Sequence, residues 1–408
     1  VHGVVLRTVE QPQVAQTRAV AGLVDEAAVL TEQQIALAQW LAEAALAPLS
    51  ACIALMLPPG LGQQTDTLYR LQGVPARELS PTQRRLVSLL HKHGPLRGAQ
   101  LDRKLPQMDW RSAARSLVRS GVIASEPVLP APCVRPRVVR TARLACSPEQ
   151  AQAALEALGR PGSQAAARRQ AMLRLLLAQK GPLDVAWIYA ECGGSLADLR
   201  FLSERGLVEL GASEVWRDPL AQLTPQPYLP PPLTPAQQAV WQQVRQRIEQ
   251  AAQGQPGPVL LLHGVTGSGK TEIYLHAVQE TLALGRQAIV LVPEIALTPQ
   301  TVQRFVGRFP GRVGLMHSGL SDGERYDTWR RARAGEFEVI VGPRSALFVP
   351  FRRLGLLVVD ECHDGSYYQS EAAPYFHARE AAVAYAARVG AACLLGSATP
   401  DLESFCRA

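Results

Sequence analysis

The sequence LLLHGVTGSGKTEIYL, residues 260–275, constrains the fold of this chain more than any other stretch. It contains the pattern Gly-x-x-x-x-Gly-Lys-Thr at Gly264, Gly269, Lys270 and Thr271, between a strand-like apolar run and a helix-like run. In this order, backbone N–H groups and a helix N-terminus can cradle the β and γ phosphates of a nucleotide. The stretch therefore predicts a phosphate-binding loop, and a glycine turn beside a surface lysine is the alternative.

Each residue type in this loop has a physical purpose. Glycine lets the backbone adopt positive φ and approach the phosphates closely. Lys270 supplies a point charge to the phosphates, and the hydroxyl of Thr271 supplies a ligand to Mg²⁺. The residues expected to bind the nucleotide are Gly264, Val265, Thr266, Gly267, Ser268, Gly269, Lys270 and Thr271.

From residue 239 onward, short apolar runs rich in β-branched residues alternate with helix-like segments. This alternation predicts a parallel sheet with helices on both faces, in which ligands bind at the carboxyl ends of the strands. The expected strands are residues 259–262, 288–292, 312–316, 339–341, 356–359 and 392–395.

The apolar run 356–359 ends in Asp360-Glu361-Cys362-His363, about ninety residues after the loop. A P-loop nucleotide hydrolase holds Mg²⁺ with an aspartate at the tip of such a strand. We therefore predict Lys270, Asp360 and Glu361 as catalytic residues, with Glu361 orienting or deprotonating the attacking water. Thr271 and Asp360 are the predicted Mg²⁺ ligands. A turn followed by a helix N-cap is the alternative.

Two similar units precede this domain. RRLVSLLHKHGPL, from residue 84, and RQAMLRLLLAQKGPL, from residue 169, each lead through further helices to a strand-like segment that starts near a glycine, Gly121 or Gly206. Helix, turn, helix, helix and hairpin is the winged-helix arrangement, which binds DNA or serves as a spacer. We predict winged helices at 79–130 and 165–220. The third helix of the first unit is basic, through Arg111, Arg115 and Arg119, which favours DNA contact there.

The remaining segments are interpreted as linkers and a partial domain. Residues 131–164 are basic and begin with a proline-rich stretch, which indicates a solvated linker or an arm that follows phosphates. Residues 221–238 are dense in proline and should form an extended linker to the domain at 239–408. Residues 1–62, with a helix N-cap expected at Thr31, are interpreted as the end of a small domain.

Bulk properties narrow the class of protein. The formal net charge of +7 and pI of about 9.2 suit a polyanionic partner, although a GC-rich genome also explains the arginine content. The seven cysteines include no Cys-x-x-Cys pair, so reduced thiols in a cytoplasmic protein are expected. We also expect no membrane span, because no run of 18 apolar residues occurs. The chain begins without methionine and ends just after a motif, so we expect part of a longer polypeptide.

Several motifs resemble one known family. Asp-Glu-x-His at 360–363, followed by GSAT at 396–399, resembles the signature of superfamily 2 helicases and translocases. The segments LVPEIALTPQ (291–300), HSGLSDGERYDTWRRARAGEFEVIVGPRSALFVPF (317–351) and DECHDGSYYQSE (360–371) resemble the PriA family of bacterial replication-restart helicases. The resemblance is word for word over many residues of 258–405, and it is weaker but collinear through the preceding units.

This resemblance implies a multidomain α/β fold. A RecA-like P-loop lobe would follow two winged-helix units and the remainder of a domain that binds DNA 3′ ends. Gln237 would read the adenine of ATP. His363, Ser397 and Thr399 would couple the nucleotide state to DNA grip.

The resemblance also implies a DNA-binding surface. Its aromatic-rich loop offers side chains on which bases can stack, although four aromatics in ten residues also suit a core. The implied DNA-binding residues are Pro293, Glu294, Arg344, Ser345, Tyr367, Tyr368, Tyr375, Phe376 and Arg379.

The implied activity is 3′ to 5′ unwinding driven by ATP and Mg²⁺, with recognition of forked and single-stranded DNA. Primosome and single-strand-binding proteins would be the protein partners of a monomer. Zn²⁺ is expected only in a C-terminal region outside this chain, as is the second lobe that supplies an arginine for catalysis.

Four positions differ from the family pattern. Cys362 replaces a glutamate, Tyr368 and Tyr375 replace cationic residues, and Phe376 replaces a tyrosine. A fork-binding scaffold without unwinding activity is therefore the alternative function. A branch-migration motor of the RecG type is disfavoured, because twin winged helices precede the motor.

Overall fold

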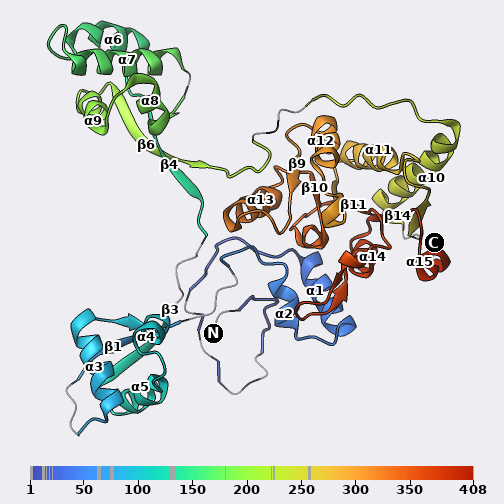
Figure 1. Ribbon diagram of the computed structural model, residues 1–408, viewed down its shortest axis with the longest axis horizontal. Helices are drawn as coiled ribbons and strands as arrows, with labels where there is room; N and C mark the ends of the chain where they lie inside the picture. The colour runs from blue at the N-terminus through green and yellow to red at the C-terminus, as the bar shows by residue number, and fades with distance from the viewer. Residues whose placement is uncertain are drawn as a thin grey trace. The chain divides into compact units, whose positions relative to one another are not determined.

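The computed structural model describes most of the chain (Figure 1). It divides into two compact units, one formed by Val1–Val134 with Leu220–Ala408 and the other by Arg135–Pro219. The residues that the structure describes are 3–11, 14, 16–17, 19–20, 22–61, 66–73, 78–128, 134–179, 181–221, 223, 226–255 and 259–407.

A six-stranded sheet in the order β7-β14-β11-β8-β10-β9 forms the centre of the first unit. Every neighbouring pair in this sheet is parallel. The strands are β7 (Leu260–His263), β8 (Gln287–Leu291), β9 (Val313–Leu315), β10 (Val339–Gly342), β11 (Leu354–Val359) and β14 (Ala392–Ser397).

Both faces of this sheet are covered. Along β8, Ile289 and Leu291 belong to one hydrophobic cluster, whereas Ala288 and Val290 belong to another. Because successive side chains of a strand point to opposite faces, the two clusters lie on opposite sides of the sheet. The parallel sheet predicted from the alternating apolar runs is confirmed, as is the RecA-like lobe that the family resemblance implies.

Helices α10 (Pro235–Ala252), α11 (Lys270–Ala283) and α12 (Pro299–Arg308) contribute to one cluster, and α13 (Asp322–Ala334) and α14 (Ala378–Val389) to the other. The residues at which these helices begin can be recognised in the sequence. Thr234 caps α10 with a capping box closed by Gln237, with proline at the first helical position. The remaining elements of this lobe are η2 (Glu294–Ala296), η3 (Arg344–Phe348), η4 (Gly365–Tyr367), β12 (Tyr368–Gln369), β13 (Phe376–His377) and α15 (Leu402–Arg407).

The N-terminal segment shares a core with this lobe. Helix α1 (Glu32–Ala44), capped by Thr31 as predicted, and α2 (Leu49–Ala54) pack together, and α1 packs against α14. The buried side chain of Gln34 donates a hydrogen bond from Nε2 to the carbonyl of Phe348, at 2.8 Å. Sequence patterns suggested a separate small domain, but the apolar residues of α1 are buried in the same cluster as those of α14.

Two units with a similar order of strands and helices follow in the sequence. The first contains β1 (Asp66–Leu71), α3 (Pro81–His93), β2 (Leu96–Arg97), α4 (Gly98–Lys104), α5 (Trp110–Arg119) and β3 (Ile123–Val128). The second contains β4 (Arg137–Leu144), α6 (Pro148–Ala154), η1 (Leu155–Ala157), α7 (Gln164–Ala178), β5 (Leu183–Asp184), α8 (Val185–Cys192), α9 (Leu196–Glu204) and β6 (Val208–Val215). Their sheets, β2-β1-β3 and β5-β4-β6, are antiparallel and occupy equivalent positions.

Two expectations about these units are wrong. No hairpin closes either unit within the described residues; the last strand pairs with a strand that precedes the helices, β1 or β4. The predicted linker 131–164 contains β4, α6 and η1; β4 pairs with β6 along its whole length, and its Thr141 and Ala142 are buried while Arg137 and Arg140 are exposed. Such a long-range strand partner leaves no local turn signal. Residues 131–133 lie outside the described residues.

Across the described part of the chain, the helices are all too short or too polar to cross a lipid bilayer.

The shared core makes a prediction about stability. Leu37 on α1 is fully buried, so Leu37→Ala should lower the free energy of unfolding of the lobe by about 2 to 5 kcal/mol. Chemical denaturation followed by tryptophan fluorescence measures this change. The control Leu46→Ala, at a side chain that is 93% exposed, should change it by less than about 0.5 kcal/mol. Equal stability of the two variants would contradict the shared core.

Candidate nucleotide and nucleic-acid site

The predicted motifs meet at one edge of the sheet. Because all six strands are parallel, the loops after them leave from the same edge. The phosphate loop follows β7, Ser397 ends β14, and Asp360 follows β11. Pro293 lies after β8 and Arg344 after β10. Parallel pairing thus gathers segments that are far apart in the sequence.

The phosphate loop has the backbone conformation that its glycines predict. Gly267 and Gly269 have φ of 81° and 87°, in the left-handed region. A Cβ atom on Gly264 would lie 2.7 Å from the hydroxyl of Ser268, and one on Gly269 would collide with the amide of Gln237. Gln237 Nε2 donates to the carbonyl of Ser268 at 2.9 Å, which places this predicted adenine-reading residue against the loop.

Lys270 begins α11 and crosses the inside of the loop. Its side chain is 8% exposed, and Nζ donates to the carbonyl of Gly264 at 2.8 Å. Nζ also lies 3.7 Å from Oε1 of Glu361. Thr271 is half-buried in the same first turn of α11, and Val265, Thr266, Gly267 and Ser268 are exposed. The lysine and the acidic pair therefore face one another at the edge of the sheet.

Asp360 is held rigidly at the end of β11. Its Oδ1 accepts hydrogen bonds from the hydroxyl of Tyr274, at 2.9 Å, and from the backbone N–H of Glu361, at 3.0 Å. Its backbone carbonyl accepts from the hydroxyl of Tyr367 at 2.7 Å. Burial raises the pKa of the Asp360 carboxyl, and the bond from Tyr274 opposes that rise.

Glu361 has a φ of 44°, an uncommon conformation for a residue with a side chain. Backbone strain of this kind persists where the surrounding structure fixes it, and it clusters at functional sites. Its Oε2 lies 3.7 Å from Nδ1 of His363.

Three predicted coupling residues are linked. The hydroxyl of Ser397 and Nδ1 of His363 share a hydrogen bond of 2.7 Å, and the N–H of Thr399 donates to the same hydroxyl at 3.0 Å. These contacts join the loop after β11 to the loop after β14. Cys362 between them is fully buried, and burial raises the pKa of its thiol to about 11, so it serves as core.

Sequence reasoning missed two residues of this site. Tyr274 lies one turn into α11 and is 1% exposed, and its hydroxyl reaches Asp360. Gly396 in GSAT makes room for that ring, because a Cβ atom there would collide with the tyrosine hydroxyl. The GSAT motif contained the signal for Gly396, but no pattern in the sequence pairs it with Tyr274.

The predicted backbone-tracking residues surround the same edge. Glu294 is exposed and accepts a hydrogen bond from Ser318 Oγ at 2.9 Å, after the buried Pro293. Arg344 donates to the carbonyl of Tyr368 at 3.0 Å and pairs with Glu371 at 2.6 Å. Ser345 beside it is half-buried. Arg344 therefore joins this edge of the sheet to the aromatic loop.

The aromatic loop divides into exposed and buried members. Tyr368 and Tyr375 are 48% and 53% exposed, so their rings can stack on bases. Tyr367 and Phe376 are 1% and 7% exposed; Tyr367 bonds to Asp360, and Phe376 packs edge-on against Phe348 at 5.7 Å. The alternative interpretation, that these aromatic residues pack in the core, is therefore correct for Tyr367 and Phe376. Their prediction as residues that stack on bases is wrong.

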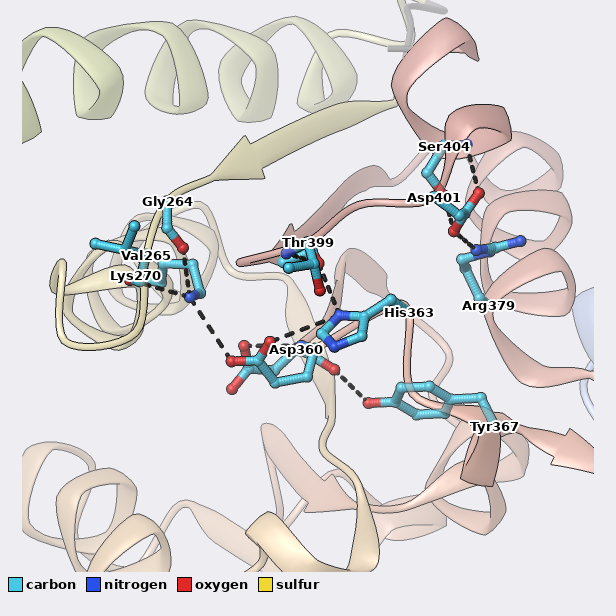
Figure 2. Close-up of polar contacts among 12 residues, drawn as sticks. Gly264, Val265, Lys270, Asp360, His363, Tyr367, Arg379, Thr399, Asp401 and Ser404 are labelled. Carbon is cyan, nitrogen blue, oxygen red and sulfur yellow. Dashed lines mark hydrogen bonds and ion pairs between the residues drawn. The ribbon is translucent and has the colours of Figure 1, made fainter.

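Arg379 also differs from its prediction as a DNA contact. It is 8% exposed and pairs with Glu380 and Asp401, which in turn accepts hydrogen bonds from Ser404. Figure 2 shows Arg379 directed toward Asp401, apart from Lys270. Its charge is compensated inside the lobe, so it has a structural role.

The residues present fit a nucleotide with Mg²⁺. The glycine-lined loop leaves space that a Cβ atom would fill at Gly264, and a lysine and two carboxylates face it. Among the described residues no group of three or more His, Cys, Asp and Glu side chains could hold a metal ion. Mg²⁺ suits this arrangement, because it is usually bound by one or two protein oxygens together with phosphates and water.

The raised pKa of Asp360 makes a prediction. At a pH above that pKa, the buried ionised carboxylate lowers the stability of the folded state. Asp360→Asn should therefore raise the Tm at pH 7, by about 2 to 4 °C for each kcal/mol relieved. The gain should shrink as the pH falls toward the raised pKa, because the wild-type carboxyl then becomes protonated. Calorimetry at several pH values tests this, with the exposed Asp322→Asn as control; a lower Tm for Asp360→Asn would refute it.

The difference between exposed and buried residues of the aromatic loop leads to a further prediction. Arg379→Ala should lower the free energy of unfolding by about 1.5 to 3 kcal/mol, because it leaves Asp401 without its charged donor. Tyr368→Ala and Tyr375→Ala should leave folding unchanged and weaken single-strand binding by about 1 to 3 kcal/mol per stacked base. Denaturation and fluorescence anisotropy measure the two effects. If the Arg379→Ala protein were as stable as the wild type but bound DNA more weakly, Arg379 would be a DNA contact after all.

Comparison with known proteins agrees with this geometry. The DEAD/DEAH box helicase family matches residues 234–407, and the 3′DNA-binding domain (3′BD) family matches residues 1–58. Replication restart protein PriA of Bacillus subtilis is 36% identical over 391 residues, 95% of this chain and 46% of the relative. That of Synechocystis is 35% identical over 384 residues, 90% of this chain and 43% of the relative.

The chain thus spans a little under half the length of these relatives. Among solved structures, RecG bound to a three-way DNA junction is 25% identical over 43% of this chain and 22% of that one, with a TM-score of 0.33. The sequence matches run through the phosphate loop, the acidic box and the N-terminal segment. The chain belongs to the PriA family of superfamily 2 helicases.

Proposed function

We propose that this chain is the ATP-binding and DNA-recognising part of a replication-restart helicase. The observation that carries the proposal is the position of Lys270 Nζ, 2.8 Å from the carbonyl of Gly264 and 3.7 Å from Glu361. A phosphate held in the loop would meet the lysine, the N-terminus of α11 and the acidic pair together.

The residues have separable roles in hydrolysis. Lys270 and the backbone N–H groups of the loop bind the phosphates, and Gln237 against Ser268 reads adenine. Thr271 and Asp360 would hold Mg²⁺, which neutralises charge on the transferring phosphoryl group. Glu361 orients the attacking water and accepts its proton, and the neighbouring His363 and Lys270 fix the direction of its carboxylate.

The nucleotide site and the DNA-binding surface are coupled through contacts between adjacent loops. The bond between His363 and Ser397 links the acidic box to the loop after β14. Arg344, which follows β10, donates to the carbonyl of Tyr368, whose ring is one of the two exposed aromatic rings. A strand stacked on Tyr368 and Tyr375 would therefore act on the same edge of the sheet as the nucleotide.

The whole protein, in this proposal, unwinds DNA 3′ to 5′ at forks and loads the replisome. Forked and single-stranded DNA, primosome proteins and single-strand-binding protein are its proposed partners in the cytoplasm, where it acts as a monomer. Zn²⁺ would belong to a region beyond residue 408. The N-terminal segment 1–62, which shares a core with the lobe from 239, and the winged helices are proposed as further DNA-contacting parts.

Nucleotide binding tests the core of this proposal. Lys270→Ala in the 408-residue chain should weaken ATP binding by about tenfold to a hundredfold, because a charge-assisted contact of about 1.5 to 3 kcal/mol is lost. Titration with a fluorescent ATP analogue measures the affinity, and Lys92→Ala on α3 is the control. Unchanged affinity for ATP in Lys270→Ala would exclude the loop as the nucleotide site.

A fork-binding scaffold is the second candidate, favoured by a specific observation. Tyr368 and Tyr375 carry no charge, and Arg379 is buried in ion pairs, so the aromatic loop offers few cations to DNA. ATPase assays of the complete polypeptide decide between the two. Turnover that rises with single-stranded DNA supports the helicase; fork-specific gel shifts with no turnover support the scaffold.

A further inference from the structure

The proline-rich segment before α10 is attached to the lobe. We name residues 226–234 the strap. The density of proline predicts an extended linker there, and the strap has no regular secondary structure. However, Tyr228 and Leu233 pack against the cluster formed by α10, α11 and α12. Figure 1 shows this segment running past α12 and α11 before it enters α10.

The strap crosses α12 at a glycine. The backbone N–H of Tyr228 donates to the carbonyl of Gly307 at 3.3 Å. A Cβ atom on Gly307 would lie 3.3 Å from the nitrogen of Tyr228 and would collide with the carbonyl oxygen of Gln226. The strap can therefore approach the helix backbone this closely only because residue 307 has no side chain.

The strap then reaches the helix that carries the phosphate-binding lysine. The hydroxyl of Tyr228 donates to Oε2 of Glu272 at 3.0 Å. Glu272 lies in the first turn of α11, directly after Lys270 and Thr271, and its side chain is 8% exposed. Burial and the neighbouring Glu272 raise the pKa of Tyr228, so its hydroxyl stays protonated and keeps donating at neutral pH.

The other oxygen of Glu272 is closed off by α10. Its Oε1 lies 3.5 Å from Nε2 of His276, whose ring packs on that of Trp241 at 5.4 Å. Burial lowers the pKa of His276, with Arg308 acting in the same direction and Glu272 against it, so the imidazole is neutral at pH 7. Tyr228 is consequently the hydroxyl donor that stabilises this buried carboxylate.

One continuous segment thus holds the phosphate loop on both sides. At the end of the strap, Thr234 caps α10, and Gln237 three residues later donates to Ser268, just before Lys270. Tyr228 donates to Glu272, just after Lys270. The two contacts bracket the residues whose N–H groups and ammonium would meet a phosphate.

We propose that Tyr228 and Glu272 are positioning residues for nucleotide binding, which hold the first turn of α11 in the orientation that binds phosphate. This inference rests on the proposed ATP site and adds the strap to it. Since coupling between two sites is reciprocal, a bound nucleotide must in turn stabilise the strap. The second unit ends at Pro219, a few residues before the strap, so the attachment that sets nucleotide affinity is also the connection to that unit.

Binding of a fluorescent ATP analogue to the 408-residue chain tests the proposal. Tyr228→Phe should weaken binding about threefold to tenfold, because Glu272 loses its hydroxyl donor while the ring stays packed. The matched control is Tyr326→Phe on α13, a half-buried tyrosine that leaves α11 untouched and should bind ATP normally. A structural role alone would lower the Tm of Tyr228→Phe and leave its affinity for ATP unchanged, which would overturn the proposal.

A second variant disturbs the strap from α12 instead of from α11. Gly307→Ala should push the strap off α12 without changing any group near the phosphates. Because alanine favours helix more than glycine does, α12 itself should not be weakened. Its affinity for ATP should fall in the same direction as that of Tyr228→Phe.

Hydrogen exchange of the wild-type chain is the third measurement, and it requires no variant to fold. The strap residues that carry a backbone N–H, which are Gln226, Tyr228, Leu229, Leu233 and Thr234, should exchange more slowly when ATP is bound. A wild-type chain that fails to bind ATP contradicts the nucleotide site itself. Wild-type binding with normal affinity in both variants, or with strap exchange unaffected by ATP, contradicts the strap alone.

Discussion

The parallel register of β7, β14 and β11 is the constraint on which the site depends. It aligns Leu394 and Leu395 of β14 with β7 on one side and with β11 on the other, so the loops after all three strands leave from the same edge of the sheet. This shared edge brings Lys270 Nζ and Glu361 Oε1 to 3.7 Å from each other. The bonds of Tyr274 to Asp360 and of His363 to Ser397 then fix the loops against one another.

The sequence predicts most of this lobe, because its signals are local. A buried parallel strand is a continuous apolar run, and the glycines of the phosphate loop require positive φ, so both can be recognised over a few residues. The contacts that no pattern predicted join distant segments. Strand β4 is recognised only through its pairing with β6, about seventy residues later, and α1 only through its packing against α14.

The aromatic loop shows where composition alone fails. Tyr367 and Tyr368 are adjacent and identical, yet one hydroxyl is bonded inside the lobe and the other ring faces solvent. The two-residue strands β12 and β13 decide this, because pairing of Gln369 with Phe376 sets which neighbours turn inward. A strand of two residues is too short to show an alternation of apolar and polar residues in the sequence. Arg379 is similar, since Asp401, the half-buried carboxylate that it pairs with, follows 22 residues later.

The packing of α1 on α14 has a practical consequence for dissection of the protein. A recombinant fragment cut at the start of α10 would match the recognisable motor but would leave the surface beneath Leu37, Ala38 and Leu41 bare. Apolar area of that kind promotes aggregation during expression. The smallest soluble version of this lobe should therefore retain residues 30–61, either in the same chain or supplied as a separate peptide.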